Sequence, residues 1–275
     1  MPNLAERACF SLCLGLGRLL RSAKYSKTRT VYKDGDPSTG SGSSRAWSRG
    51  ERQVRKHRSF YAPLLIWLGG PLATLLDTGV RVLPQRDWED RERLIYRSLY
   101  GTAIRIDADG TLVLPCLAGG TLATLLEDPG LEESIRKTVI ERAAVALAEF
   151  HRSGLTHGDA MAENVMVDVE AGVARWFDFE TVHESGRPMD WRRADDVRAL
   201  LVTCLVRTGP KQLPETLQLI LDVYADEGVT RLLAASFTPV LRRALIFHLA
   251  QAGLSLQCYR EIAGLLTPVP WSTAS

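Results

Sequence analysis

Three polar residues in the stretch from residue 155 to residue 183 have the types and spacing needed to hold a metal–phosphate complex. Asp159 and Asn164 lie five residues apart on a predicted loop, and Asp178 follows a predicted strand. Phosphoryl transfer from ATP requires Mg²⁺ at the phosphate oxygens and a well-placed acceptor hydroxyl, but little covalent chemistry from the protein. Magnesium prefers carboxylate and amide oxygens, which Asp178 and Asn164 supply. The second carboxylate, that of Asp159, can accept the acceptor's proton or hold the acceptor in line.

A predicted β-hairpin brings these residues together. Val165–Val167 and Ala174–Phe177 are the expected strands, with Gly172 at the turn. Because a hairpin brings its two ends together, Asn164 and Asp178 are expected to be neighbours. The alternative interpretation is that the three polar residues only cap loops and turns. Their ordered occurrence around a strand–turn–strand unit favours a functional site.

The same stretch resembles the catalytic segment of the protein-kinase-like superfamily. The sequence HGDAMAEN at 157–164 matches the pattern H-x-D-x-x-x-x-N, and Asp178-Phe179-Glu180 stands where D-F-G is expected. The HGD form with D-F-E looks most like atypical bacterial members, namely the lipopolysaccharide (Kdo/heptose) kinases and the aminoglycoside phosphotransferases. The resemblance covers roughly residues 28–266, but only 155–180 is specific. It implies ATP and Mg²⁺ as cofactors.

Roles within the segment follow from this resemblance. Asp159 would be the catalytic residue, and Asn164 and Asp178 would be the magnesium ligands. His157 is a second catalytic candidate, although a structural role beneath the loop is the better interpretation of it. Asp196 resembles the aspartate that begins a helix of the larger lobe and braces the catalytic loop.

The resemblance also implies a lysine that binds ATP and a glutamate that pairs with it. Lys56, on a predicted third strand over Glu51–His57, fits the lysine, and Lys33 is the alternative. Glu92 fits the glutamate, and Glu89 is the alternative. Glu92 lies on a helix expected over Glu89–Tyr100, with Asp87 or Asp90 as its cap and Gly101 at its end. Taken alone, the lysine and the glutamate could equally each be one more charge on a solvated surface.

Two further segments occupy positions that bind nucleotide in the family. The linker Pro115, Cys116 and Leu117 would offer backbone groups to adenine. Asp34–Ser44 stands where a glycine-rich phosphate loop is expected, but it does not match G-x-G-x-x-G. The nucleotide site is therefore less well specified by sequence than the catalytic segment.

The order of the predicted elements indicates an α+β, bilobal, protein-kinase-like fold with a small strand-rich N-lobe and a larger helical C-lobe. The expected parts are an N-terminal amphipathic segment (1–27), the N-lobe (28–114) with an apolar insert near 59–84, a hinge linker (115–120) and the helical C-lobe (121–275). Strands are expected at 28–32, 44–48, 51–57, 102–106 and 111–114, and helices at 121–126, 131–153, 194–207, 214–227 and much of 230–266.

Departures from the family pattern restrict the acceptor. Glu180 replaces the glycine of D-F-G, no A-P-E sequence follows, and Thr181–Arg193 is too short for a long activation loop. The sequence therefore predicts a kinase acting on a hydroxyl of a sugar, a glycolipid or another small molecule, with a protein Ser or Thr kept open. The alternative is a pseudokinase, that is, a binding or scaffold module.

Composition limits partners and location. Lys and Arg total 34 and Asp and Glu total 32, so the net charge of +2 provides no global field for nucleic acid. Five scattered cysteines without a CxxC pair argue against a zinc site or a disulfide framework and favour a cytoplasmic setting. The uncharged stretch 59–76 is broken by Pro63 and by Gly69-Gly70-Pro71, and basic residues precede it. Peripheral contact with the inner face of a membrane is the remaining alternative to simple burial.

Overall fold

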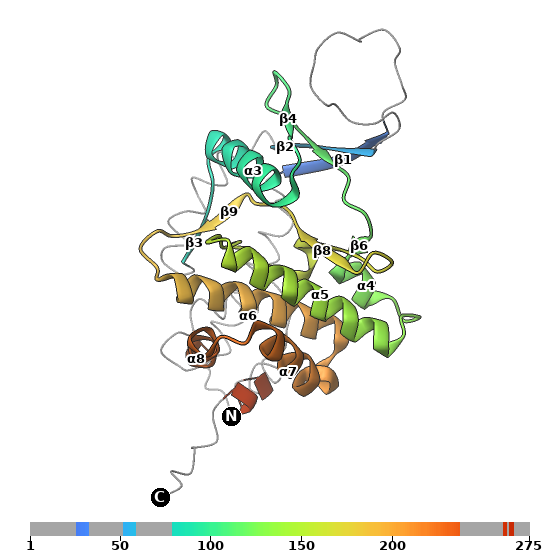
Figure 1. The fold of residues 1–275 in the computed structure, drawn as a ribbon, viewed down its shortest axis with the longest axis vertical. Helices are drawn as coiled ribbons and strands as arrows, with labels where there is room; N and C mark the ends of the chain where they lie inside the picture. Colours follow the sequence, from blue (N-terminus) through green and yellow to red (C-terminus); the bar gives the residue numbers. More distant parts are fainter. Residues whose placement is uncertain (1–25, 33–51, 59–78, 237–260, 263, 267–275) are drawn as a thin grey trace, which may run out of the picture. The chain divides into compact units, whose positions relative to one another are not determined.

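The computed structural model describes residues 26–32, 52–58, 79–236, 261–262 and 264–266. Within these residues the chain is a mixed α+β protein with antiparallel sheets, as expected (Figure 1). It divides into two units. The sheet unit contains the described residues 26–32, 52–58 and 83–117, and the helical unit contains 79–82 and the described residues from 118 onward.

The sheet unit contains a four-stranded antiparallel sheet in the order β1-β2-β5-β4. The strands are β1 (Ser26–Tyr32), β2 (Arg52–Arg58), β4 (Arg105–Ile106) and β5 (Leu112–Pro115). In the central pairing, Lys56 of β2 lies opposite Leu112 of β5. A tight turn at 107–110 joins β4 to β5, with Gly110 at a φ of 77°. These strands confirm four of the predicted ones, while the strand expected at 44–48 lies outside the described residues.

One helix, α3 (Gln85–Tyr100), belongs to the sheet unit. Its buried side chains follow the i, i+4, i+7, i+8 spacing of an amphipathic helix, namely Trp88, Glu92, Ile95 and Tyr96. The prediction that Asp87 or Asp90 caps the helix is wrong, because the helix begins directly after Pro84, whose fixed φ suits a helix start. The predicted end is confirmed, since Gly101 takes a left-handed conformation.

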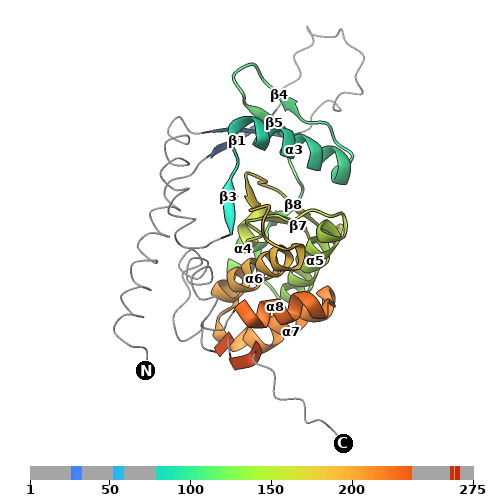
Figure 2. The same cartoon turned by 90° about the vertical axis from the view of Figure 1, so that its left-hand side faces the viewer.

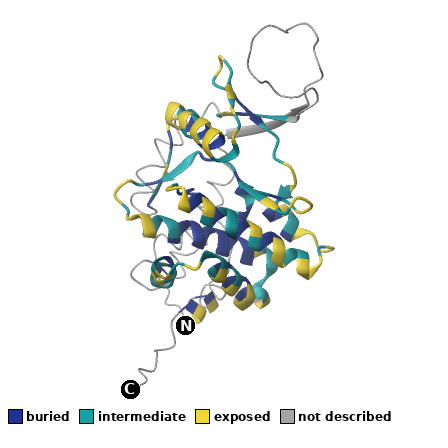
Figure 3. Ribbon diagram, in the orientation of Figure 1, coloured by how far each residue is buried: buried dark blue, intermediate teal, exposed yellow. Residues whose placement is uncertain are grey.

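Five helices pack together in the described part of the helical unit (Figures 1 and 2). Contacts join α5 to α7 and α6 to both α4 and α8. Residues 194–205 of α6 are buried without a break, which makes α6 the central helix of the unit (Figure 3). The helices are α4 (Leu122–Glu127), α5 (Glu133–Arg152), α6 (Met189–Thr208), α7 (Leu213–Tyr224) and α8 (Glu227–Ser236), and a 3₁₀ turn, η2 (Pro210–Gln212), precedes α7.

The predicted hairpin is present and forms part of a three-stranded sheet in the helical unit. Its strands are β7 (Val165–Asp168) and β8 (Val173–Trp176), and Gly172 at the turn has a φ of 64°. A short strand, β6 (Gly120–Thr121), pairs with the other edge of β7, and the 3₁₀ turn η1 (Ala162–Asn164) leads into β7. The hairpin packs against α5, so its end is fixed by the core.

A two-stranded ribbon was not predicted. In it β3 (Val80–Val82) pairs with β9 (Thr181–His183). Beside this ribbon, a Cβ on Gly79 would stand 2.3 Å from a ring carbon of Trp191, so only glycine fits there. Strands of three residues carry too little periodicity to be recognised in a sequence. The ribbon anchors the segment that follows Asp178-Phe179-Glu180.

The predicted amphipathic segment 1–27 lies mainly outside the described residues, and the apolar stretch 59–76 lies entirely outside them. In the part of the chain that the structure describes, no helix combines the length and the apolar character required to cross a bilayer.

Candidate functional site

The amide of Asn164 closes the loop that carries Asp159. Its Nδ2 donates hydrogen bonds to Asp159 Oδ2 at 2.9 Å and to the Asp159 carbonyl oxygen at 2.8 Å. The Asn164 side chain is buried at the end of η1, directly before β7. Because both of these bonds come from Nδ2, the amide oxygen Oδ1 is left to bind a ligand. The structure thus brings together the first two residues of the predicted site.

Asp178 is held beside Asn164 by the hairpin. Val165 pairs with Trp176, and the Phe177 N–H donates to the Asn164 carbonyl oxygen at 2.9 Å, so Asp178 is the next residue. Asp178 has a φ of 68°, a left-handed conformation that is uncommon for a residue other than glycine. Such local strain persists where the surrounding structure imposes it, and it is frequent at functional sites.

The carboxylate of Asp159 lies in a negative environment. Burial raises its pKa to about 8, and repulsion from the Asp178 carboxylate adds to the effect. Glu163 and Glu180 act in the same direction, whereas the hydrogen bond from Asn164 lowers the pKa and offsets only part of the shift. The loop therefore concentrates negative charge beside an amide oxygen, a donor set that suits a hard cation.

This donor set fits a metal that arrives with a phosphate group better than a metal held by protein alone. Among the described residues, no group of three or more His, Cys, Asp or Glu side chains could hold a metal ion. Mg²⁺ is usually bound by one or two carboxylates together with substrate phosphates and water. Asn164 and Asp178 fit that pattern, because they supply an amide oxygen and a carboxylate and leave other positions to the nucleotide.

His157 packs beneath the loop and is fully buried. Its Nε2 faces the Phe177 carbonyl oxygen at 3.0 Å and must donate to it, while Nδ1 accepts the Asp159 N–H at 3.2 Å. Its ring contacts those of Phe150, Trp176 and Phe179. With both ring nitrogens engaged inside the protein, the geometry favours the structural interpretation of His157 over the catalytic one.

Asp196, at the start of the buried part of α6, braces the loop from below. Its carboxylate accepts the backbone N–H groups of His157 at 2.6 Å and Gly158 at 2.9 Å. The ring of His151 also lies 2.9 Å from it through Nε2. Burial alone would raise the pKa of Asp196, but the interactions with His183, His151 and His157 outweigh burial and lower it well below its ordinary value. Asp196 therefore stays charged in the core.

Sequence reasoning assigned no role to His151 and His183, yet both belong to this brace. His151 Nδ1 is hydrogen-bonded to the Tyr224 hydroxyl group, which ties α5 to α7. His183 contacts Asp195 at 3.2 Å through Nε2, and Asp195 also forms an ion pair with Arg198. The available signal was weak, because His151 lies near the end of a predicted helix and meets its partners only after folding.

Gly158 is required at its position in the loop. It has a φ of 83°, and a Cβ at this position would lie 3.0 Å from the Cα of Val182 in β9. Phe179 is buried and stacks on Phe150, with ring centroids 5.5 Å apart. Both the loop that carries Asp159 and the segment after Asp178 are therefore fixed against the core of the helical unit.

The sheet unit contains the predicted lysine and its partner. Lys56 Nζ lies 3.5 Å from Glu92 Oε1, and both side chains are almost completely buried. The alternative glutamate, Glu89, instead accepts a hydrogen bond from Gln85. Lys33 lies outside the described residues, so the structure does not decide between the two lysines. A buried ion pair is costly to desolvate, so its presence is weak evidence for a purely stabilising role.

The predicted linker begins at the end of β5. Pro115 is the last residue of that strand and pairs with Gln53, and Cys116 and Leu117 follow it, half-buried. The loop Asp34–Ser44 lies outside the described residues. Among the residues expected to contact nucleotide, the structure therefore places Lys56, Glu92 and the linker within the sheet unit.

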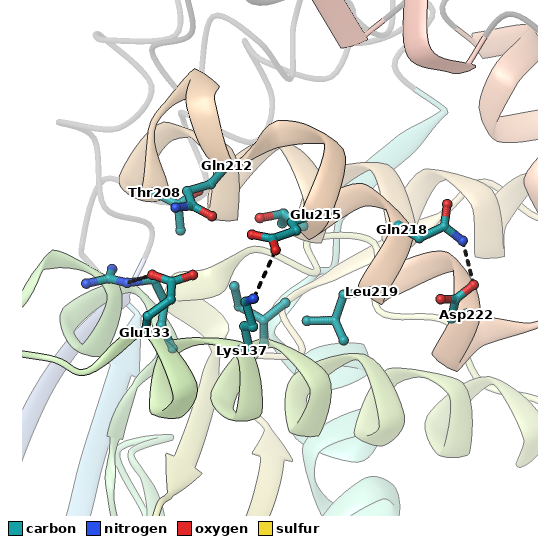
Figure 4. A pocket seen from close by; sticks show the side chains of 11 residues that line it. Glu133, Lys137, Thr208, Gln212, Glu215, Gln218, Leu219 and Asp222 are labelled. Atoms are coloured by element: carbon teal, nitrogen blue, oxygen red, sulfur yellow. Dashed lines mark hydrogen bonds and ion pairs between the residues drawn. The ribbon is translucent and has the colours of Figure 1, made fainter.

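Two cavities in the helical unit are separate from the predicted site residues. One, of about 230 Å³, lies between α5 and α7 and is crossed by the ion pair between Lys137 and Glu215 at 2.9 Å (Figure 4). The other, of about 580 Å³, lies next to it and shares Arg136 and Thr208. None of the predicted catalytic, metal-binding or nucleotide-binding residues lines either cavity.

Comparison with known proteins assigns no family to the chain. No family model matches it, and no curated protein is significantly similar to it in sequence.

Proposed function

We propose that the protein is an ATP- and Mg²⁺-dependent phosphotransferase with a bilobal, protein-kinase-like fold and a hydroxyl group as its acceptor. The observation that carries the proposal is the arrangement of the catalytic loop. Asn164 holds Asp159 by two hydrogen bonds, and the hairpin places Asp178 next to Asn164. A metal–phosphate complex requires these residue types, and a loop that served only structure would gain nothing from the repulsion between Asp159 and Asp178.

Each of the three residues has a separate role in this proposal. Asn164, through Oδ1, and Asp178 hold Mg²⁺, which when bound neutralises charge on the phosphate oxygens of ATP. Asp159 orients the acceptor hydroxyl and accepts its proton. In the metal-free protein the pKa of Asp159 is raised to about 8. Bound Mg²⁺ would offset the repulsion from Asp178 and lower this pKa, which favours the ionised carboxylate that accepts the proton.

Nucleotide binding is assigned to the sheet unit. Lys56, paired with Glu92, binds the phosphates, and the backbone of Pro115, Cys116 and Leu117 faces the adenine. The buried ion pair supports this assignment, since a nearby carboxylate favours the charged form of the lysine. The positive charge of Lys56 complements the negative charge of a nucleoside triphosphate.

The acceptor is proposed to be a sugar, a glycolipid or another small molecule rather than a protein. The strand β9 ends at His183 and α6 begins at Met189, so only Glu184–Pro188 connects them. A connection of this length leaves no room for a long, regulated activation segment after Asp178. Phosphorylation of a protein Ser or Thr is the alternative that an acceptor experiment must exclude.

Turnover of ATP by the purified full-length protein tests the proposal. We expect phosphate transfer or ATP hydrolysis that requires Mg²⁺, stops in EDTA and is lost in Asp159→Ala. The matched control is Asp168→Asn, because Asp168 lies on the same hairpin and accepts the Ala171 N–H with its carboxylate. Unchanged turnover in Asp159→Ala, or equal loss in both variants, would contradict the assignment.

A panel of acceptors with labelled ATP then identifies the substrate class. Free sugars, lipid extracts and unstructured Ser/Thr peptides should be compared at equal concentration. Incorporation into sugar or lipid fractions supports the proposal, and incorporation only into peptide contradicts its small-molecule part. Nucleotide binding without any turnover would favour a pseudokinase, which binds but does not transfer.

A further inference from the structure

The buried face of α3 contains a tryptophan that contacts both members of the lysine–glutamate pair. Trp88 is fully buried and lies one helical turn before Glu92. Its indole Nε1 donates a hydrogen bond to Glu92 Oε1 at 3.1 Å. This is the same oxygen that lies 3.5 Å from Lys56 Nζ. The carboxylate therefore faces two donors, and one of them is neutral and rigid.

The ring of Trp88 also lies against two cations of β2. Lys56 Nζ is 5.0 Å from the ring centroid, and the guanidinium carbon of Arg58 is 4.8 Å from it. Lys56 and Arg58 are two residues apart on a strand, so they project from the same face. Arg58 Nη1 also donates to the Leu83 carbonyl oxygen at 2.6 Å, directly before α3 begins. The ring is thus held between β2 and its own helix.

The distances indicate which contact fixes the geometry. A tight hydrogen bond between an ammonium and a carboxylate measures about 2.7–2.9 Å, so the 3.5 Å contact between Lys56 and Glu92 is mainly Coulombic. Such an attraction depends weakly on direction and by itself does not fix the conformation of a lysine with four rotatable bonds. The indole hydrogen bond is shorter and directional, and the ring can move very little because it is buried.

We infer that Trp88 is a positioning residue for the nucleotide-binding lysine: its N–H orients the Glu92 carboxylate, its ring confines the Lys56 ammonium, and the affinity for nucleotide phosphates depends on both contacts. This inference rests on the proposed role of Lys56. It adds a residue that sequence patterns did not indicate, because tryptophan has no expected place in the lysine–glutamate pair. Trp88 acts through Lys56 and Glu92 and is not assigned a contact with the substrate.

Calorimetric titration of the full-length protein with Mg-ATP provides the first test. Trp88→Phe keeps an aromatic ring but removes the N–H, and we expect it to weaken binding about 5- to 10-fold, the effect of losing one ordinary hydrogen bond. The matched control is Ile95→Val, because Ile95 is equally buried on α3 and forms no part of the pair. Binding by Ile95→Val should stay within about twofold of wild type.

A double-mutant cycle distinguishes positioning from general loosening of the helix. If Trp88 acts through Glu92, its substitution should have little further effect once Glu92→Gln has removed the charge that it orients. The double variant Trp88→Phe/Glu92→Gln should therefore bind Mg-ATP as Glu92→Gln does. Additive losses would show that Trp88 acts by another route and would overturn the inference.

A readout that needs no nucleotide separates this inference from the proposed function. An amine-acylating reagent, followed by mass spectrometry of the peptide that contains Lys56, measures how firmly the lysine is held. We expect acylation about threefold faster in Trp88→Phe, because a buried, paired ammonium reacts only when it is released, and no change in Ile95→Val. Equal rates in wild type and Trp88→Phe would overturn the inference.

The two failures are distinguishable. If wild type binds Mg-ATP and Trp88→Phe binds it equally well, the inference fails and the proposed function stands. If wild type binds no nucleotide, the proposed function fails together with the claim about affinity, and the acylation rate alone decides whether Trp88 positions Lys56.

Discussion

Two aspartates of the helical unit, one beneath the loop at 157–164 and one on it, have pKa values shifted in opposite directions. Asp196, below the loop, accepts two backbone N–H groups and is surrounded by histidines, so its pKa is lowered. Asp159, on the loop, is half-buried and held by Asn164, and desolvation together with repulsion from Asp178 raises its pKa to about 8. One carboxylate is stabilised by the protein, and the other is placed where the folded protein disfavours its charge.

The two carboxylates differ in the role that their surroundings suggest: Asp196 in the stability of the fold and Asp159 in activity. The protein satisfies Asp196 with donors from the loop and from α5, which is typical of a group that holds a fold together. It leaves Asp159 beside another carboxylate, an arrangement that destabilises the isolated protein and becomes favourable when a cation is bound. Removal of the Asp196 carboxylate should therefore lower stability, whereas removal of the Asp159 or Asp178 carboxylate should lower activity.

The largest expected effect is on turnover. Asp178→Asn removes a charge that the proposed metal site requires, and we expect ATP turnover to fall about 10²- to 10⁴-fold. The same change removes the repulsion with Asp159, so the free energy of unfolding in metal-free buffer should rise or stay constant. Activity assays and urea denaturation on one preparation measure both. A variant that loses stability and activity together would contradict this difference in roles.

The next effect is on stability. Asp196→Ala leaves two backbone N–H groups and the ring of His151 without their acceptor, and we expect about 3–5 kcal/mol lower stability, as for a broken buried pair. The control is Asp190→Ala, because Asp190 is exposed in the first turn of the same helix and pairs with Arg193 at 3.6 Å. It should cost less than about 1 kcal/mol. Similar losses in both variants would show that Asp196 is not a brace.

A third expectation concerns pH, measured with EDTA present. Because the pKa of Asp159 is raised to about 8 in the folded protein, the folded state holds this proton more tightly than the unfolded chain does. The stability gained by binding this proton is complete below about pH 4, the pKa of an aspartate in the unfolded chain. It is lost as the pH rises through the pKa that Asp159 has in the folded protein. Asp159→Asn should therefore gain stability over wild type with rising pH in this window. Parallel curves would contradict the raised pKa.

The smallest effect concerns the outer part of the brace. Tyr224→Phe removes the hydroxyl partner of His151 Nδ1 while keeping the ring that packs against the histidine. We expect a loss of about 0.5–1.5 kcal/mol in the free energy of unfolding, the value of one hydrogen bond, and unchanged turnover per folded molecule. Denaturant titration checks the first part. A loss as large as that of Asp196→Ala would place the centre of the brace at α7 instead.

The sequence predicted those parts of the fold that depend on local chemistry. The hairpin around Gly172 and the end of α3 at Gly101 follow from turn and helix-cap residues, and both are present. The predicted start of α3 was wrong, because two aspartates suggested a cap where Pro84 begins the helix. The ribbon of β3 and β9 was missed, since each strand has three residues and is specified by its partner rather than by its own pattern.

The candidate site was predictable to a similar degree. Asn164 and Asp178 lie at the two ends of one hairpin, so sequence alone placed them together. His151 and His183 could not be found, because each reaches the Asp195–Asp196 pair only through the packing of elements distant in sequence. Trp88 was missed because a buried apolar residue on a helix face is ordinary core, and only the structure shows that its N–H is directed at Glu92.

The measurement that tests the central claim most directly is the Mg²⁺ dependence of ATP binding. Calorimetric titrations of wild type with ATP should show at least about tenfold tighter binding in Mg²⁺ than in EDTA. In Asp178→Asn and Asn164→Ala this difference should disappear while weak, metal-independent binding remains. Wild-type affinity that does not depend on Mg²⁺, or a dependence that survives in both variants, would contradict the assignment of a metal–nucleotide site to these residues.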